Sequence, residues 1–285
     1  MAESQQTKTR FFCPLFNFRI SEVEDEGDDT KAIRVHVLKE LNSFVEGFKF
    51  IDYTKIRRIR NQELEKMNVK HEIDYNIAGA FYNTYEGLFV VEFPRDPKEK
   101  LAPFVENVLL ALRLYKEGDV FCKVIFSENG LNFTFLDPTY EMPNPLHRTI
   151  YSLGMEEIGK IREIFDKITK TDFDKRRYLR IACDRFNRSY GKSMPDEKII
   201  DFMIAFEALF LREEKTSSPG QTIGVGGSIL LGKNDLERKE IYNFLVKTYK
   251  LRNKIVHGSA ITYSGINETV SKLKGNLRKS ITALL

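Results

Sequence analysis

The sequence predicts a two-domain protein, with an N-terminal α+β domain over residues 1–140 and a C-terminal all-helical bundle over residues 150–285. Two patterns lead to this prediction. Short alternating apolar runs recur in the first half, as in strands, whereas apolar residues recur at helical spacing through the second half. A third observation places the boundary, because three prolines fall within residues 137–146, and such a density is typical of a linker. We expect the linker to span residues 141–149.

The elements of the N-terminal domain are predicted from apolar alternation and from turn residues. The acidic run at 22–29 is typical of a solvated loop. Asn129 and Gly130 separate two apolar runs, and this dipeptide favours a hairpin. The predicted strands cover residues 32–38, 44–51, 88–93, 120–126 and 131–136, and the predicted helices cover residues 53–67 and 96–116.

About five amphipathic helices are predicted in the C-terminal half. Each carries apolar residues three and four apart, which would face a common core. The predicted helices cover residues 155–168, 173–190, 195–212, 236–258 and 270–284. The glycine-rich stretch 217–233 is expected to be a flexible link that leads into a short packed turn.

The composition is that of a soluble globular protein. Of 285 residues, 42% are hydrophobic and 30% are charged. No apolar run approaches the length of a membrane span, and the N-terminus lacks the apolar core of a signal peptide, so no membrane contact is expected. Three widely spaced cysteines match neither a disulfide framework nor a zinc pattern. These features together predict a cytoplasmic protein.

Charge is distributed unevenly along the chain. Residues 1–146 carry 19 Lys and Arg against 24 Asp and Glu, a net −5, and residues 147–285 carry 26 against 17, a net +9, which together give the overall +4. A basic half suggests contact with an anion, and nucleic acid is the commonest large anion. A solvated lysine-rich surface is the alternative.

The predicted helix 236–258 has an arginine in the middle of its apolar face. A guanidinium cannot lose its charge, so burying Arg252 is costly unless it is paired. On the preceding long helix, Glu207 projects at the edge of the apolar face. We therefore predict an ion pair between Glu207 and Arg252, with a purely structural role as the alternative. Asn253 and His257, four residues apart, lie together at the edge of the same apolar stripe.

Other kinds of site are disfavoured. Gly227, Gly232 and Lys233 match the spacing of a phosphate loop, but Asn234 stands where Ser or Thr would bind magnesium, and the interior of the loop is apolar. The four histidines lie far apart and outside any metal-binding spacing, so we expect no metal and no cofactor. The chain has no G-x-S-x-G turn of the kind that serine hydrolases use.

The segment LRNKIVHG, which contains Arg252 and His257, resembles the Arg-x(4–6)-His signature of the HEPN (higher eukaryotes and prokaryotes nucleotide-binding) superfamily. The FEALF core around Glu207 and the small-residue-rich stretch before the last long helices are similar to the Apea-like, abortive-infection branch. The resemblance covers roughly residues 150–285 and implies an HEPN helical bundle. The N-terminal half resembles domains that precede such modules only in the order of its elements, and a sensing or regulatory role is expected for it.

The resemblance implies an activity, a partner and a role for each candidate residue. Catalytic members are metal-independent endoribonucleases that act as homodimers, attack with the RNA 2′-hydroxyl and leave a 2′,3′-cyclic phosphate. Carried onto this chain, His257 would transfer protons, and Arg252 would bind the scissile phosphate. Asn253 would orient the phosphate or the histidine, and Glu207 would hold Arg252. The arginines expected to follow the RNA backbone are Arg176, Arg177, Arg180 and Arg188.

The resemblance favours a toxin or antiphage defence effector, whose trigger, regulatory partner and RNA target stay open. One branch, which pairs with a nucleotidyltransferase antitoxin, carries a tyrosine two residues after the histidine, where this chain has Ser259, so a partner of that type is disfavoured. Two alternatives remain. The bundle is a non-catalytic nucleotide-binding, RNA-binding or dimerisation module, or it is a scaffold in which Arg252 and Glu207 form only an ion pair.

Overall fold

The chain divides into two compact units. A computed structural model describes residues 8–16, 18–20, 48–52, 85–94, 101–122, 124–127, 133–135, 149–211 and 217–285. The first unit, called here the sheet unit, comprises residues 1–112, 118–138 and 148–163. The second, called here the helical unit, comprises residues 113–117, 139–147 and 164–285. The predicted linker lies outside the described residues except for Thr149.

The sheet unit contains a five-stranded antiparallel sheet. Strand β1, Lys8–Phe16, lies at its centre, and the strand order is β3-β4-β1-β5-β6. Cys13 and Leu15, two residues apart, are both buried, as alternation along a strand requires. A second, parallel pair joins β2 to β7. The other strands are β2 Phe18–Ile20, β3 Phe48–Asp52, β4 Tyr85–Pro94, β5 Val124–Ser127, β6 Phe133–Phe135 and β7 Tyr151–Leu153.

Several elements predicted for the N-terminal half are present. The strands expected at 44–51, 88–93, 120–126 and 131–136 correspond to β3, β4, β5 and β6, and β5 pairs with β6 as a hairpin would. The helix expected at 96–116 is α6, Leu101–Tyr115. The strand at 32–38 and the helix at 53–67 fall outside the described residues. Strands β1, β2 and β7 were not predicted, and β7 lies inside the range expected to be all-helical.

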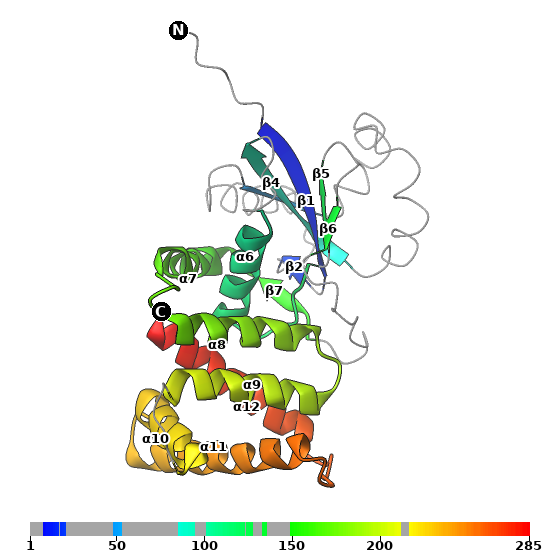
Figure 1. The fold of residues 1–285 in the computed structure, drawn as a ribbon. Coiled ribbons are helices and arrows are strands. Elements are labelled where there is room, and N and C mark those ends of the chain that lie inside the picture. The colour runs from blue at the N-terminus through cyan, green and yellow to red at the C-terminus, as the bar shows by residue number, and fades with distance from the viewer. Residues whose placement is uncertain are drawn as a thin grey trace, which may run out of the picture. The chain divides into compact units, whose positions relative to one another are not determined.

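The C-terminal region is helical, as predicted. Apolar residues from each helix meet in one core, where Phe186, Phe202, Phe206 and Leu277 are almost fully buried. Helix α9 packs against four others, namely α8, α10, α11 and α12. In Figure 1 α12 passes behind α8 and α9. The helices are α7 Ile158–Lys170, α8 Arg177–Arg188, α9 Pro195–Phe210, α10 Pro219–Leu231, α11 Asp235–Val256 and α12 Ile266–Leu284, with short 3-10 turns at Met155–Glu157 and Ser189–Gly191.

The glycine-rich stretch corrects one prediction. Residues 217–233 were expected to form a flexible link, but Pro219–Leu231 is helix α10. Glycine lowers helix propensity, yet here its lack of a side chain allows close packing of α10 on α11. A Cβ at Gly224 would lie 2.8 Å from the ring of Tyr242, and one at Gly227 would lie 2.3 Å from Cδ1 of Leu245. Tertiary packing thus outweighs the local propensity.

The last turn of α6 belongs to the helical unit. The buried Arg278 on α12 donates from Nε to the carbonyl oxygen of Arg113 at 2.8 Å, and it lies 3.5 Å from the Glu117 carboxylate. Arg113, also buried, donates to the side-chain oxygen of Asn187 on α8 at 2.8 Å, and its guanidinium lies 4.2 Å from the ring centre of Tyr190. The residues 113–117 are therefore tied to both α8 and α12.

Candidate functional site

Helix α11 positions Arg252, Asn253 and His257. Its start is fixed by Asn234, whose side-chain oxygen accepts a hydrogen bond from the amide of Glu237 at 2.9 Å. Its end is fixed by Gly258, which has a φ of 67°. The amide of Gly258 donates to Ile255, and that of Ser259 donates to Lys254, the pair of bonds that closes a Schellman motif. His257 is consequently the C-cap residue, directly after the last helical residue, Val256.

Arg252 and Glu207 form the ion pair that the sequence predicted. A terminal nitrogen of Arg252 lies 3.5 Å from the Glu207 carboxylate, and the two side chains are 22% and 24% exposed. The other terminal nitrogen donates to the side-chain oxygen of Asn253 at 3.2 Å. The Nε of Arg252 is buried and has no hydrogen-bond partner among the described residues. The guanidinium is thus held through its two terminal nitrogens, and its Nε–H makes no described hydrogen bond.

The environment of Glu207 opposes its ionisation. Burial raises the pKa of this carboxyl above its ordinary value, and the nearby Arg252 charge offsets part of the rise. A carboxylate that is desolvated and paired with only one cation is an incomplete partner for a guanidinium. The carboxylate of Glu207 therefore depends on the charge of Arg252, its ion-pair partner.

His257 lies at the edge of this cluster. Its side chain is exposed, and its backbone amide donates to the Asn253 carbonyl oxygen at 3.0 Å. Within the described ranges, no hydrogen bond or ion pair joins its imidazole to Arg252 or to Glu207. The structure brings Arg252, Asn253 and Glu207 together, and it places His257 one turn beyond Asn253 with its ring open to solvent.

The predicted arginine ridge lies on and just before α8, and all four of its residues are exposed. Arg180 is paired with Asp174 at 3.2 Å, and Arg176 donates to the backbone oxygen of Leu284 at 3.2 Å. Asp184 adds a further negative charge to the same helix. Burial raises the pKa of Asp184, and the neighbouring Arg188 and Arg180 lower it. The ridge, which also includes Arg177, is therefore partly neutralised by its own surroundings.

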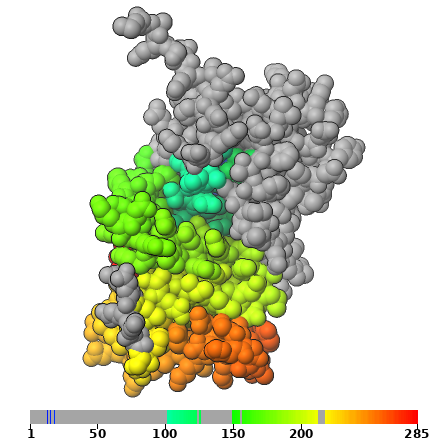
Figure 2. All heavy atoms as spheres, in the orientation of Figure 1, coloured from blue at the N-terminus to red at the C-terminus, as the bar shows by residue number. Residues whose placement is uncertain are grey.

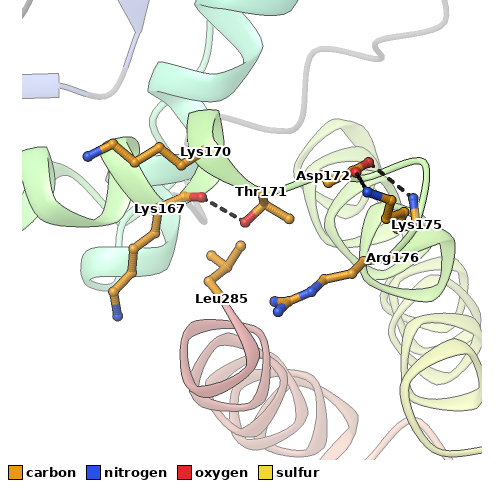
Figure 3. A pocket seen from close by; sticks show the side chains of 7 residues that line it. All are labelled: Lys167, Lys170, Thr171, Asp172, Lys175, Arg176 and Leu285. Carbon is orange, nitrogen blue, oxygen red and sulfur yellow. Dashed lines mark hydrogen bonds and ion pairs between the residues drawn. The ribbon is translucent and has the colours of Figure 1, made fainter.

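A basic pocket of about 460 Å³ opens at the turn between α7 and α8, and the sequence did not predict it. Figure 3 shows Arg176 pointing toward Leu285, while Lys167 and Lys170 extend their amines away from Asp172. Asp172 is paired with Lys175 at 3.1 Å, and hydrogen bonds from Lys175 lower its pKa. The remaining lining residue is Thr171. Because Leu285 comes from the far end of the chain, sequence spacing alone gave no signal for this pocket.

Neither a metal centre nor a spanning helix is found where the structure is described. Nowhere in the described ranges do three His, Cys, Asp or Glu side chains gather closely enough to bind a metal ion. No helix in those ranges has the length and apolar character needed to cross a bilayer. Cys13, Cys122 and Cys183 are buried free thiols.

Comparison with protein-family models, with curated proteins and with solved structures finds no match for this chain.

Proposed function

We propose that this protein is a metal-independent endoribonuclease of HEPN type, with Arg252 and His257 as its catalytic residues. The observation that carries the proposal is the half-buried guanidinium of Arg252. It is oriented by Glu207 and Asn253, and the exposed His257 lies at the end of the same helix. An oriented cation next to an ionisable imidazole is a combination suited to phosphoryl transfer.

The proposed chemistry needs no group beyond protein side chains and the RNA itself. The RNA 2′-hydroxyl loses its proton to a base as its oxygen attacks the adjacent phosphorus. The bond from phosphorus to the 5′-oxygen breaks, the leaving oxygen gains a proton, and a 2′,3′-cyclic phosphate results. His257 serves in proton transfer because an imidazole titrates near neutral pH. Arg252 offsets the negative charge that develops on the phosphoryl oxygens.

The wider proposal concerns assembly and biological role. Two copies of the chain would form a homodimer in which both Arg252 and His257 pairs face one cleft. The charge asymmetry supports a nucleic-acid substrate, since residues 147–285 carry the net +9. We place the protein among toxins or antiphage effectors of the Apea-like type, in the cytoplasm, with the N-terminal half sensing a trigger or restraining the nuclease.

A second function is favoured by one observation. Arg252 already has an ion-pair partner, and its guanidinium makes no described contact with the imidazole of His257. A module that binds a nucleotide or RNA without cleaving it would need no such contact. In that case the Arg252 cluster would recognise a phosphate, and the N-terminal half would carry the activity of the protein.

The test is an RNA cleavage assay in EDTA, with wild type beside His257→Ala and with the product ends identified. We expect 2′,3′-cyclic phosphate ends from the wild type and a loss of cleavage of at least about a hundredfold in the variant, the scale of a lost general acid or base. His257 is exposed, so the melting temperature should not change. Cleavage that persists in His257→Ala would exclude it as the catalytic residue, and RNA binding without cleavage by the wild type would favour the binding module.

A further inference from the structure

The outer face of α11 carries a row of lysines that leads to His257. Lys247, Lys250 and Lys254 are all exposed, and with His257 they follow one another at intervals of three or four residues. Residues at this spacing share one side of a helix. With a rise of about 1.5 Å per residue, the row covers about 15 Å of the helix. In Figure 2 the C-terminal part of α11, in orange, lies at the surface of the helical unit.

This row is uncompensated by acidic residues. No Asp or Glu occurs between residues 241 and 267. None of the three lysines forms an ion pair or a hydrogen bond through its amine with the residues that the structure describes. The arginine ridge differs in this respect, because Arg180 is held by Asp174 and Arg176 is bound to a backbone oxygen. An ammonium group without an ion-pair partner can neutralise a phosphate, and so release the counterion condensed there, without first leaving a carboxylate.

The helix itself does not account for the row. Cations stabilise the C-terminal end of a helix only within about its last turn, which includes Lys254 but leaves out Lys247 and Lys250. These two lysines lie one and two turns further from the helix end, and they face away from the packing surfaces with α9 and α10. They make no described contact within the protein, so their amines are available to a partner that binds from outside.

We propose that single-stranded RNA binds along the outer face of α11, with its phosphates on Lys247, Lys250 and Lys254, and that this path delivers the strand to His257. The inference rests on the proposed function, and it names the binding surface of the same site. A single row of cations matches one sugar-phosphate backbone, whereas a duplex presents two. The exposed Tyr263, in the segment that follows His257, adds an aromatic ring of the kind on which unpaired bases stack.

The test compares two triple variants of the full-length chain, each built on His257→Ala so that cleavage does not interfere. One variant carries Lys247→Gln, Lys250→Gln and Lys254→Gln. Its matched control removes the same charge from α8 through Arg177→Gln, Arg180→Gln and Arg188→Gln. Binding of a fluorescein-labelled single-stranded RNA of mixed sequence is followed by fluorescence anisotropy over a range of salt concentrations, and circular dichroism checks that both variants melt like the parent.

We expect the α11 variant to bind at least about tenfold more weakly at low salt, and the slope of log Kd against log salt to fall by about 2, since each phosphate contact with a single strand contributes about 0.7. The α8 variant should change affinity by less than about threefold. An equal or larger effect of the α8 variant would overturn the proposal, as would a parent protein that does not bind RNA at low salt.

Together with the cleavage assay of the wild type, this experiment separates the inference from the proposed nuclease activity. If RNA binding depends on the three lysines but the wild type cleaves nothing, the binding surface stands and the catalytic proposal fails. If the wild type cleaves RNA and the α11 variant binds it as tightly as the parent, the catalytic proposal stands and the binding surface is wrong.

Discussion

At the scale of single residues, the state of Glu207 determines how Arg252 is held. Burial raises the pKa of this carboxyl, so the folded chain binds its proton more tightly than the unfolded chain does. The stabilisation that protonated Glu207 gives the folded chain is therefore complete below the ordinary pKa of 4.5. This stabilisation is lost as the pH rises through the raised pKa of the folded chain. At neutral pH the carboxylate is tolerated because Arg252 lies 3.5 Å away.

Removing the Arg252 charge should raise the pKa of Glu207 further, because burial would then act without opposition. The variant to make is Arg252→Met, and the measurement is a carbon-13 NMR titration of the Glu207 carboxyl. The control is Arg252→Lys, which keeps a positive charge and should shift the pKa less. A Glu207 pKa that is unchanged in Arg252→Met would show that the guanidinium is not its partner in solution.

The contact between Glu207 and Arg252 could be predicted from sequence because both are charged residues at apolar positions of amphipathic helices. The orientation of the guanidinium could not be predicted, since it depends on the neighbours of Arg252 in space. The unused Nε of Arg252 is visible only in three dimensions. The same holds for the arginine ridge. The spacing of Arg176 and Arg180 could be seen in the sequence, but the hydrogen bond from Arg176 to Leu284 and the ion pair of Arg180 with Asp174 could not.

At the scale of elements, the close packing of α10 on α11 depends on glycines, which have no side chain. Gly227→Ala would place a methyl group 2.3 Å from Cδ1 of the fully buried Leu245, so this side chain would have to shift within the core. We expect the free energy of unfolding to fall by about 1–3 kcal/mol, as in other overpacked cores. Urea denaturation followed by circular dichroism measures the change.

The matched control for this prediction is Gly275→Ala on α12. A Cβ at Gly275 meets nothing within 4 Å, so the substitution should stabilise the protein by roughly 0.5–1 kcal/mol through helix propensity alone. Two glycine-to-alanine changes in helices should therefore have opposite signs. If Gly227→Ala were stabilising as well, the close packing of α10 on α11 would not exist in solution.

Helix α10 also shows where reading elements from sequence fails. Turn residues such as Ser217, Ser218, Pro219 and Gly220 begin the stretch, and four more glycines follow up to Gly232, so local propensity favours a loop. The glycines of α10 pack closely against Tyr242 and Leu245 of α11, and these two residues lie well beyond the glycine-rich stretch in the chain. Amphipathic helices such as α9 and α11 were predictable because their own residues contain the pattern.

At the scale of the whole molecule, the two compact units do not follow one another along the chain. Residues 113–117 belong to the helical unit although they precede the last strands of the sheet unit. This exchange could not be predicted from the sequence, since a boundary inferred from prolines assumes that each domain is continuous. Arg113 looks like an ordinary surface residue at the end of an amphipathic helix, and only its contacts with Asn187 and Arg278 reveal where it belongs.

A fragment of residues 150–285 should therefore be less stable than the full chain. It would lack Arg113 and Glu117, so Arg278 and Asn187 would lose their hydrogen-bond and ion-pair partners, and Tyr190 would lose the guanidinium over its ring. Each buried polar group that loses its partner costs about 1–3 kcal/mol. Thermal melting followed by circular dichroism should give a lower melting temperature for the fragment.

The full-length variant Arg278→Met provides the comparison for this fragment, because it removes the same hydrogen bonds without removing any residues. A melting temperature for the fragment equal to that of the intact chain would mean that residues 113–117 do not support the helical unit.

The stripe of glycines on α10 has a consequence for tracing the ancestry of this chain. Positions 220, 224 and 227 are constrained by the close packing of α10 on side chains of α11, whereas under the proposed function Arg252 and His257 are constrained by a chemical role. A lineage that abandoned the chemistry would be free to replace the arginine and the histidine, but any descendant that kept α10 against α11 would still need small residues at the three positions. The spacing of small residues at positions 220, 224 and 227 is thus a search pattern that does not depend on activity. It can detect descendants that have lost both Arg252 and His257.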